Sequence, residues 1–406
     1  MALHGPLAGI RIVAIENAIA GPYGSMIMAD LGAEVIKVEP PEGEISRRFA
    51  GPRHKGESFY FMAFNRNKKS VTLDLGTPRG HRAFCELTGK ADVFWHNLRP
   101  AAIEQLGLGY GSLSKANRRL IMCSLSGYGS SGPYCDRPSY DVIGEAVSGT
   151  LSITGEPGQR PVRPGPPIAD LATGMFGAIG VLSALAKRAE TGVGQELEVA
   201  MLDASVSWLT YYFSYFFVSG LVPGPQGSGH LGLSPYGVYR TKDRYIALGV
   251  SWPRVARAIG ADWLVDDPRF RDLEGRVKHK AELDRTIEEH LAKATAEQWL
   301  SVFEAEDIAA GPVLTIEEAS RDPQVQHRNM VLKMEHPLGG EIRLVGNPVK
   351  MTGVGQEEYQ PPPTLGQHTH DVLSGILDYS DDAIASLKAE EREHAPERAR
   401  HVFKQL

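Results

Sequence analysis

Asp170 lies where the sequence changes from a proline-rich segment to a long apolar helix pattern. Pro166 and Pro167 precede it, and small or apolar residues predominate from Leu171 to about Arg188. An aspartate at a helix start is typical of an N-cap, whose carboxylate accepts hydrogen bonds from the first backbone N–H groups. The helix dipole also favours the ionised carboxylate, which can act as a nucleophile. The sequence therefore leaves two compatible roles open for Asp170, a helix cap and a nucleophile.

Strand and helix patterns alternate on both sides of this helix. The runs that predict strands are 9–15, 34–38, 70–75, 92–95, 120–126 and 196–202. Helical patterns between them are 23–31, 78–88, 101–106 and 140–147, followed by the Asp170 helix. This alternation predicts the α/β class, with a doubly wound, Rossmann-like parallel sheet and right-handed connections. Such sheets bind ligands beyond the carboxyl ends of their strands, which selects the segments 16–22, 73–76, 97–100 and 127–133.

The chain has 406 residues, which is long for one hydrophobic core. A Gly/Pro/Ser-rich stretch at 220–232 predicts a linker. We expect a large domain of residues 1–225 plus 329–406 and a smaller α+β domain of residues 226–328. Within the smaller domain, 238–240 and 245–250 predict a hairpin, with helices near 282–292 and 296–305. The aromatic segment 208–222 predicts a buried helix, and 387–400 a charged tail.

Composition excludes several classes of protein. The net charge of −6 gives no broad basic field, so we expect no nucleic-acid partner. Cys85, Cys123 and Cys135 are scattered, and the N-terminal residues lack a signal-peptide pattern, so we expect the reducing cytoplasm. No run reaches 18 uninterrupted apolar residues, so we expect no membrane partner.

The motif around Asp170 resembles a known family. It reads PxxDxxTGMxGxxGxLxAL and continues as RxxTGxGQ, and the resemblance to the family III CoA-transferases, the CaiB–BaiF group, extends from 9–39 to 363–373. The resemblance implies that Asp170 attacks an acyl-CoA. It also implies a coenzyme A thioester as substrate, no permanently bound cofactor, and a homodimer of interlocked rings.

The same resemblance implies which residues contact CoA. By match these are Ile19, Ala20, Leu73, Asp74, Leu75, Gly76, Asn97, Leu98, Arg99, Gln105, Arg137 and Tyr140. Pro40 stands where the family has an arginine, so Lys37, Arg99 or Arg137 is expected to pair with the phosphates instead. Ile19 stands where formyl-CoA transferases have glutamine, which makes oxalate an unsuitable substrate.

The substrate acids are less well defined by the sequence. Arg47 is a candidate for binding a second substrate carboxylate, and His230 lies where the family has a glycine-rich loop. With family precedent, the arginines favour a succinyl-CoA donor and a short dicarboxylate acceptor. His368 and His370 do not share a helix face and have no third ligand nearby, so no metal site is expected. An NAD site is disfavoured because no GxGxxG follows the first strand.

Two alternative functions remain. An α-methylacyl-CoA racemase belongs to the same superfamily but needs an acid/base pair at the α-carbon. Tyr140 replaces the histidine that racemases have before Asp141, and tyrosine is a poor base at neutral pH. A non-catalytic CoA-binding protein is the other alternative, and the intact Asp170 motif disfavours it.

Overall fold

The computed structural model describes residues 5–352 and 358–402. Its contacts divide the chain into two compact units. The larger comprises Met1–Thr150, Pro164–Thr210 and Asn329–Leu406, and the smaller comprises Leu151–Arg163 and Tyr211–Arg328. This division places 151–163 and 211–225 in the smaller unit, whereas the sequence predicted them in the large domain.

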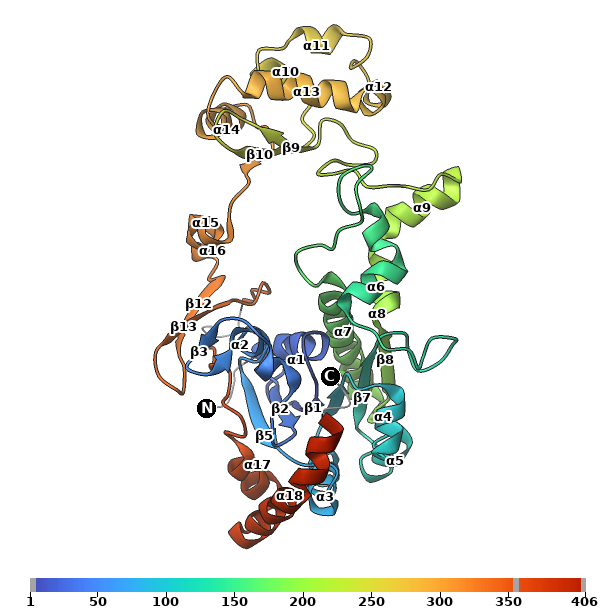
Figure 1. The fold of residues 1–406 in the computed structure, drawn as a ribbon, viewed down its shortest axis with the longest axis vertical. Coiled ribbons are helices and arrows are strands. Elements are labelled where there is room, and N and C mark those ends of the chain that lie inside the picture. Colours follow the sequence, from blue (N-terminus) through green and yellow to red (C-terminus); the bar gives the residue numbers. More distant parts are fainter. Residues whose placement is uncertain (1–4, 353–357, 403–406) are drawn as a thin grey trace. The chain divides into compact units, whose positions relative to one another are not determined.

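A six-stranded parallel sheet forms the centre of the larger unit (Figure 1). Its spatial order is β5 (Lys68–Thr72), β2 (Glu34–Glu39), β1 (Arg11–Ile15), β6 (Val93–His96), β7 (Ile121–Ser126) and β8 (Glu196–Ala200). The prediction of a parallel α/β sheet is confirmed. The chain runs outward from β1 to β5 and then returns to β6 on the other side of β1. The carboxyl ends of β1 and β6 therefore form the topological switch point of this sheet.

Helices of the larger unit cover both faces of the sheet. They are α1 (Ala20–Asp30), η1 (Ile45–Arg48), α2 (Phe59–Phe64), α3 (Pro78–Gly89), α4 (Pro100–Gln105), α5 (Tyr110–Ala116), α6 (Asp141–Ser148), α7 (Ile168–Thr191), α8 (Met201–Trp208), α17 (Thr369–Leu377) and α18 (Asp381–Val402). Two short hairpins complete the unit, β3 (Arg53–His54) with β4 (Glu57–Ser58) and β12 (Val331–Glu335) with β13 (Glu341–Val345).

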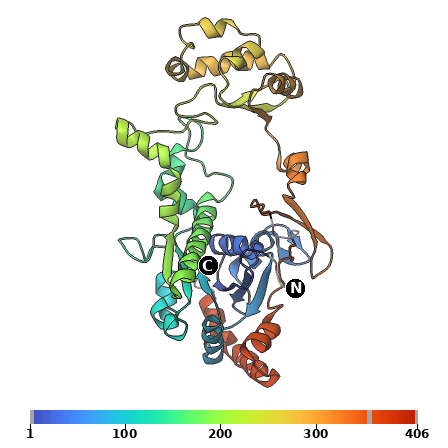
Figure 2. The same cartoon turned by 180° about the vertical axis from the view of Figure 1, so that it is seen from behind.

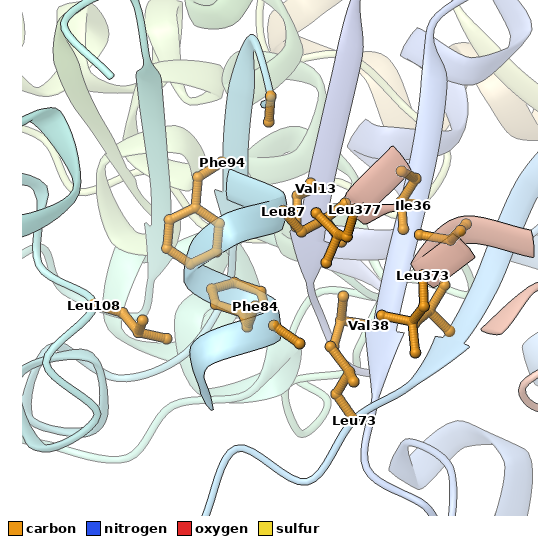
Figure 3. Packing of buried hydrophobic residues seen from close by; sticks show 14 of the residues in the cluster. Val13, Ile36, Val38, Leu73, Phe84, Leu87, Phe94, Leu108, Leu373 and Leu377 are labelled. Carbon is orange, nitrogen blue, oxygen red and sulfur yellow. The ribbon is translucent and has the colours of Figure 1, made fainter. Parts of the chain in front are cut away.

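One hydrophobic core lies between the sheet and helices from distant parts of the sequence. Phe84 and Phe94 pack edge to face, with ring centroids 5.4 Å apart. Leu373 and Leu377 of α17 enter the same cluster, as Figure 3 shows. The charged segment 387–400 is part of α18, which packs beside α3 in the larger unit (Figures 1 and 2).

The other core contains Trp95 together with residues of α1 and α7. Helix α7 is the one helix in the described part of the chain long and apolar enough to cross a membrane by length and composition. Its buried residues Ala178, Val181 and Ala184 pack in this core. Here α7 therefore serves as a core helix against the sheet.

The smaller unit has an antiparallel sheet in the order β11 (Ala310–Pro312), β10 (Tyr245–Leu248) and β9 (Gly237–Arg240). Its helices are α9 (Thr210–Ser219), α10 (Arg254–Ala258), α11 (Trp263–Asp266), α12 (Leu273–Lys278), α13 (Lys280–Leu291), α14 (Ala296–Ala305), α15 (Ile316–Arg321) and α16 (Pro323–His327). The short 3₁₀ turn η2 (Thr150–Ile153) begins at the last residue of a segment of the larger unit and continues into the smaller unit. The hydrophobic core of the smaller unit includes the buried rings of Tyr239, Phe270 and Phe303.

The aromatic segment 208–222 was expected to form one buried helix. Instead α8 ends at Trp208, and α9 has no buried residue in this chain. Phe217 and Val218 are 73% and 90% exposed. Because α9 is apolar around most of its circumference, it has no polar face to present to water.

Candidate active site

The switch point is held together by two asparagines. Asn97, after β6, accepts a hydrogen bond from the backbone N–H of Asn17 at 2.8 Å through its side-chain oxygen. Its side-chain NH₂ donates to the carbonyl of Asn17 at 2.9 Å. Asn97 was predicted to contact CoA, and in this structure its amide joins the ends of β1 and β6.

Helices α1 and α7 approach closely beside this point. A Cβ atom at Gly24 would lie 2.5 Å from the carbonyl oxygen of Gly174, and one at Gly174 would lie 2.6 Å from that of Ala20. Only glycine permits such an approach between two helix backbones. The first turn of α1, with Ile19 and Ala20 buried at its start, therefore lies beside the first turns of α7.

Asp170 is the third residue of α7, one turn before Gly174. The N-cap interpretation is corrected, because the N-cap position is occupied by Pro167, which makes no side-chain cap. The carboxylate still lies in the first helical turn, where the helix dipole favours its ionised form. Its side chain is half-buried. This placement leaves the helix-capping role to another residue.

The capping residue is Asp141, for which the sequence did not indicate a capping role. Its Oδ1 atom accepts hydrogen bonds from the backbone N–H groups of Ala169 at 3.1 Å and Asp170 at 3.3 Å. These are the donors that an N-cap side chain normally takes. The sequence carried only an indirect signal, since proline at the cap position has no side-chain acceptor. Asp141 thus holds the backbone of the candidate nucleophile.

Tyr140 directly precedes Asp141 and occupies the N-cap position of α6. Its side chain is 67% exposed, so its phenol is available to a ligand. The carboxylate of Asp141 contacts the backbone of Asp170, so the start of α6 lies beside the start of α7. Arg137, in the same loop, places its guanidinium carbon 3.8 Å from the ring centroid of Tyr134.

The remaining predicted CoA positions follow the ends of β5 and β6. Leu73 and Asp74 are buried, whereas Gly76, Arg99 and Gln105 are exposed. Leu75 and Leu98 are half-buried. Because parallel strands end at one edge of the sheet, these segments lie at the same edge as the start of α7. The structure therefore gathers the predicted segments of the larger unit along one edge.

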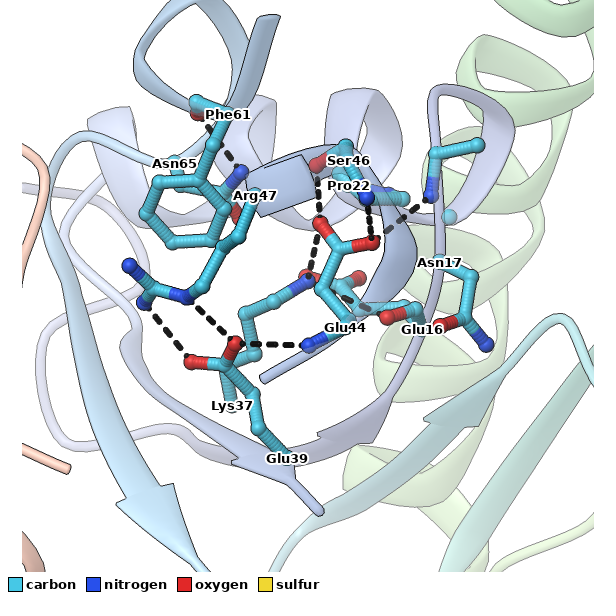
Figure 4. A network of polar contacts seen from close by, with 12 residues as sticks. Glu16, Asn17, Pro22, Lys37, Glu39, Glu44, Ser46, Arg47, Phe61 and Asn65 are labelled. Atoms are coloured by element: carbon cyan, nitrogen blue, oxygen red, sulfur yellow. Dashed lines mark hydrogen bonds and ion pairs between the residues drawn. The ribbon is translucent and has the colours of Figure 1, made fainter. Parts of the chain in front are cut away.

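A buried charge network lies under the loop that follows β1 (Figure 4). The ammonium of Lys68 donates to Glu16 at 2.7 Å and to the carbonyl of Pro22 at 2.8 Å. Lys37 donates to the carbonyl of Glu16 at 3.1 Å. Burial lowers the pKa of Lys68 to about 8, and although burial alone would raise the pKa of Glu16, the two lysines bring it below its ordinary value. These contacts fix Glu16, where the loop begins, and Pro22, in the first turn of α1.

Ala18, two residues after Glu16 in that loop, has a positive φ of 58°. Its backbone N–H donates to Glu44 at 3.3 Å, and Glu44 lies 3.7 Å from Lys37. A non-glycine residue in this region of backbone space is strained and persists where its surroundings hold it. The expectation that Lys37 pairs with CoA phosphates is therefore not retained, because its ammonium is fully buried between these carboxylates.

Arg47 has internal partners rather than an open face. Its guanidinium donates to Glu39 at 2.7 and 2.9 Å and to Glu57 at 3.1 Å. It also lies 3.4 Å from the ring centroid of Phe61 (Figure 4). We therefore do not retain Arg47 as a candidate for binding the substrate carboxylate.

The histidines singled out in the sequence have local partners. His230 belongs to the smaller unit, where its ring stacks on Tyr211 at 5.5 Å between centroids and its Nδ1 accepts from the N–H of Gly232 at 3.0 Å. His368 accepts from the N–H of Ser70 at 3.1 Å. Within residues 5–352 and 358–402, no group of three or more His, Cys, Asp or Glu side chains could hold a metal ion.

Fold and site together define an α/β protein with a helix-borne carboxylate at the ligand-binding edge of its sheet. Residues 7–369 match the model of CoA-transferase family III, and the chain belongs to that family. It is 36% identical to the succinyl-CoA:glutarate CoA-transferase of Mus musculus over 387 residues, which cover 94% of this chain and 89% of that protein. It is also 36% identical to the succinate–glutarate CoA-transferase of Agrobacterium fabrum, over 91% of this chain and 96% of that one.

A solved structure agrees with this assignment. The crystal structure of a CaiB/BaiF family protein from Brucella suis superimposes with a TM-score of 0.82 at 30% identity, covering 92% of this chain and 99% of that one. The family expectation from the Asp170 motif is confirmed.

Proposed function

We propose that this enzyme transfers CoA from succinyl-CoA to a short dicarboxylic acid, with glutarate as the first candidate, through an aspartyl-CoA thioester on Asp170. The observation that carries the proposal is the position of Asp170 in the first turn of α7, beside the start of α1. The names of the related transferases support the choice of donor and acceptor.

Four acyl transfers complete the proposed cycle. A carboxylate oxygen of Asp170 attacks the thioester carbon of succinyl-CoA, the C–S bond breaks, and a mixed anhydride and CoA thiolate form. The thiolate attacks the aspartyl carbonyl, which releases succinate and leaves aspartyl-CoA. The acceptor carboxylate attacks the thioester carbon of aspartyl-CoA, the C–S bond breaks, and a second mixed anhydride and CoA thiolate form. The thiolate then attacks the acceptor's carbonyl, which gives the acceptor's CoA thioester and releases the Asp170 carboxylate. No net proton is consumed.

Several groups at the site suit these steps. Tyr140 has an exposed phenol that could orient the thioester. Backbone N–H groups beside the reacting carbonyl would stabilise the negatively charged tetrahedral intermediates. We propose that Leu73–Gly76, Leu98, Arg99, Gln105 and Arg137 form the surface for CoA, as the family resemblance implies, with Arg99 or Arg137 as the phosphate partner.

We further propose a cytoplasmic enzyme, in keeping with free Cys85, Cys123 and Cys135.

Incubation of the enzyme with succinyl-CoA and one acid at a time tests the substrate assignment. We expect mass spectrometry to detect a new acyl-CoA with glutarate and similar dicarboxylates, and much less with butyrate, which lacks the second carboxylate. Release of free CoA without any new thioester would indicate hydrolysis and contradict the proposal. Thioester exchange with butyrate as fast as with glutarate would contradict the dicarboxylate specificity.

We also propose that the enzyme is a homodimer. Apolar side chains are exposed on three helices of the larger unit, with Val147 49% exposed on α6, Ile179 56% on α7 and Trp208 43% on α8. These three helices contact one another, and exposed apolar side chains gathered in this way are typical of an interface. Sedimentation at micromolar concentration should give a dimer, and Ile179→Glu should weaken it. Lys187→Glu, at an exposed position of the same helix, is the matched control. A wild-type monomer at that concentration would contradict the proposal.

A further inference from the structure

The C-terminal helix α18 contacts the segment that is expected to bind CoA. Lys388, Glu391 and His394 are spaced three residues apart and therefore lie near one face of the helix. Each reaches the chain at or just after the carboxyl end of β5. These contacts join positions more than 300 residues apart in the sequence.

Lys388 and Glu391 bind the backbone of this segment. The ammonium of Lys388 donates to the carbonyl of Thr72 at 2.8 Å and to Glu391 at 2.8 Å. The other carboxylate oxygen of Glu391 accepts from the backbone N–H of Asp74 at 3.0 Å. Glu391 is 4% exposed, so this hydrogen bond is shielded from water.

His394 continues the series toward Gly76. Its Nδ1 atom lies 2.7 Å from a carboxylate oxygen of Asp74, and the other oxygen of Asp74 accepts from the N–H of Gly76 at 3.0 Å. A Cβ atom at Gly76 would lie 2.7 Å from the ring carbon Cε1 of His394. The helix therefore determines the path of the chain from Thr72 to Gly76.

We infer that α18 is a positioning element of the CoA site, with Glu391 and His394 holding residues 73–76 in the conformation that receives CoA. The inference rests on the proposed function, which makes this segment a CoA contact. Ile384 and Leu387 anchor the helix independently, because both are buried in the core beneath it. Loss of Glu391 should therefore loosen the segment while leaving the helix docked.

The test compares three variants of α18. Glu391→Ala removes the acceptor for the N–H of Asp74, Glu391→Gln keeps an acceptor oxygen, and His394→Ala removes the contact with the Asp74 carboxylate. Glu393→Ala is the matched control, because Glu393 is an exposed glutamate on the same helix. Calorimetry measures the affinity for free CoA, and steady-state rates give the KM for succinyl-CoA and for glutarate.

We expect Glu391→Ala and His394→Ala to weaken CoA binding by about tenfold, as for loss of a buried hydrogen bond, and to raise the KM for succinyl-CoA. The KM for glutarate should change less than twofold. Glu391→Gln should be closer to the wild type, and Glu393→Ala should match it. Unchanged CoA affinity in both alanine variants, or an equal rise in both KM values, would overturn the inference. A wild-type enzyme that binds CoA without transferring it would instead contradict the proposed function.

Discussion

Replacement of Asp170 by asparagine is expected to abolish CoA transfer while the protein remains folded. The amide is a far poorer nucleophile than the carboxylate, so the rate should fall by on the order of 10⁴ or more. Since Asp170 is not the N-cap of α7, the free energy of unfolding should change by less than about 1 kcal/mol, the usual size of a helix-dipole interaction. Steady-state transfer to glutarate and thermal unfolding measure the two quantities.

Asp203 provides the matched control for this substitution. It is the third residue of α8, as Asp170 is of α7, and it is exposed. Asp203→Asn removes the same charge from the same position of a helix and should leave transfer unchanged. Near-normal turnover in Asp170→Asn would show that another group attacks the thioester.

Replacement of Asp141 by alanine is expected to slow the first acyl transfer by about 10- to 100-fold, because a small displacement of the nucleophile misaligns the reacting atoms. It should also cost about 1–2 kcal/mol of stability, as loss of a helix cap does. Both effects follow from the two N–H groups of α7 that Asp141 binds. Single-turnover formation of the Asp170 adduct and thermal unfolding measure the two effects separately.

Asp141→Asn tests whether Asp141 acts through its hydrogen bonds to the α7 backbone or through its negative charge. Asparagine keeps an acceptor oxygen and caps helices about as well as aspartate, so this variant should recover most of the stability and most of the rate. An Asp141→Ala protein that is destabilised but forms the adduct at the wild-type rate would show that Asp141 supports the fold alone.

The elements at the site could be predicted because their signals are local. Short apolar runs identified the strands and a helical pattern identified α7, and the rule for parallel sheets placed 73–76 and 97–100 at one edge. Asp170 could be singled out because proline, aspartate and a small-residue helix follow one another directly. The same local pattern could not show that Asp141, nearly 30 residues earlier, supplies the cap.

The missed features depend on contacts between distant residues. Arg47 was predicted to bind a substrate carboxylate, yet in the fold its guanidinium pairs with Glu39 and Glu57, which are distant enough in sequence that no local pattern shows the contact. The charge pattern of α18 could not indicate that the ring of His394 forms a hydrogen bond with the carboxylate of Asp74, 320 residues away. The buried-helix prediction for 208–222 used apolar composition alone, which does not say whether this chain or another surface covers the segment.

Trapping of the covalent intermediate tests the central claim most directly. The wild-type enzyme is mixed with succinyl-CoA in the absence of acceptor, treated with hydroxylamine or borohydride, and digested for mass spectrometry. We predict a modified peptide with the mass change located on Asp170, absent from Asp170→Asn and present in Asp203→Asn. Efficient transfer to glutarate with an unmodified Asp170 peptide, or with the adduct on another residue, would contradict the mechanism.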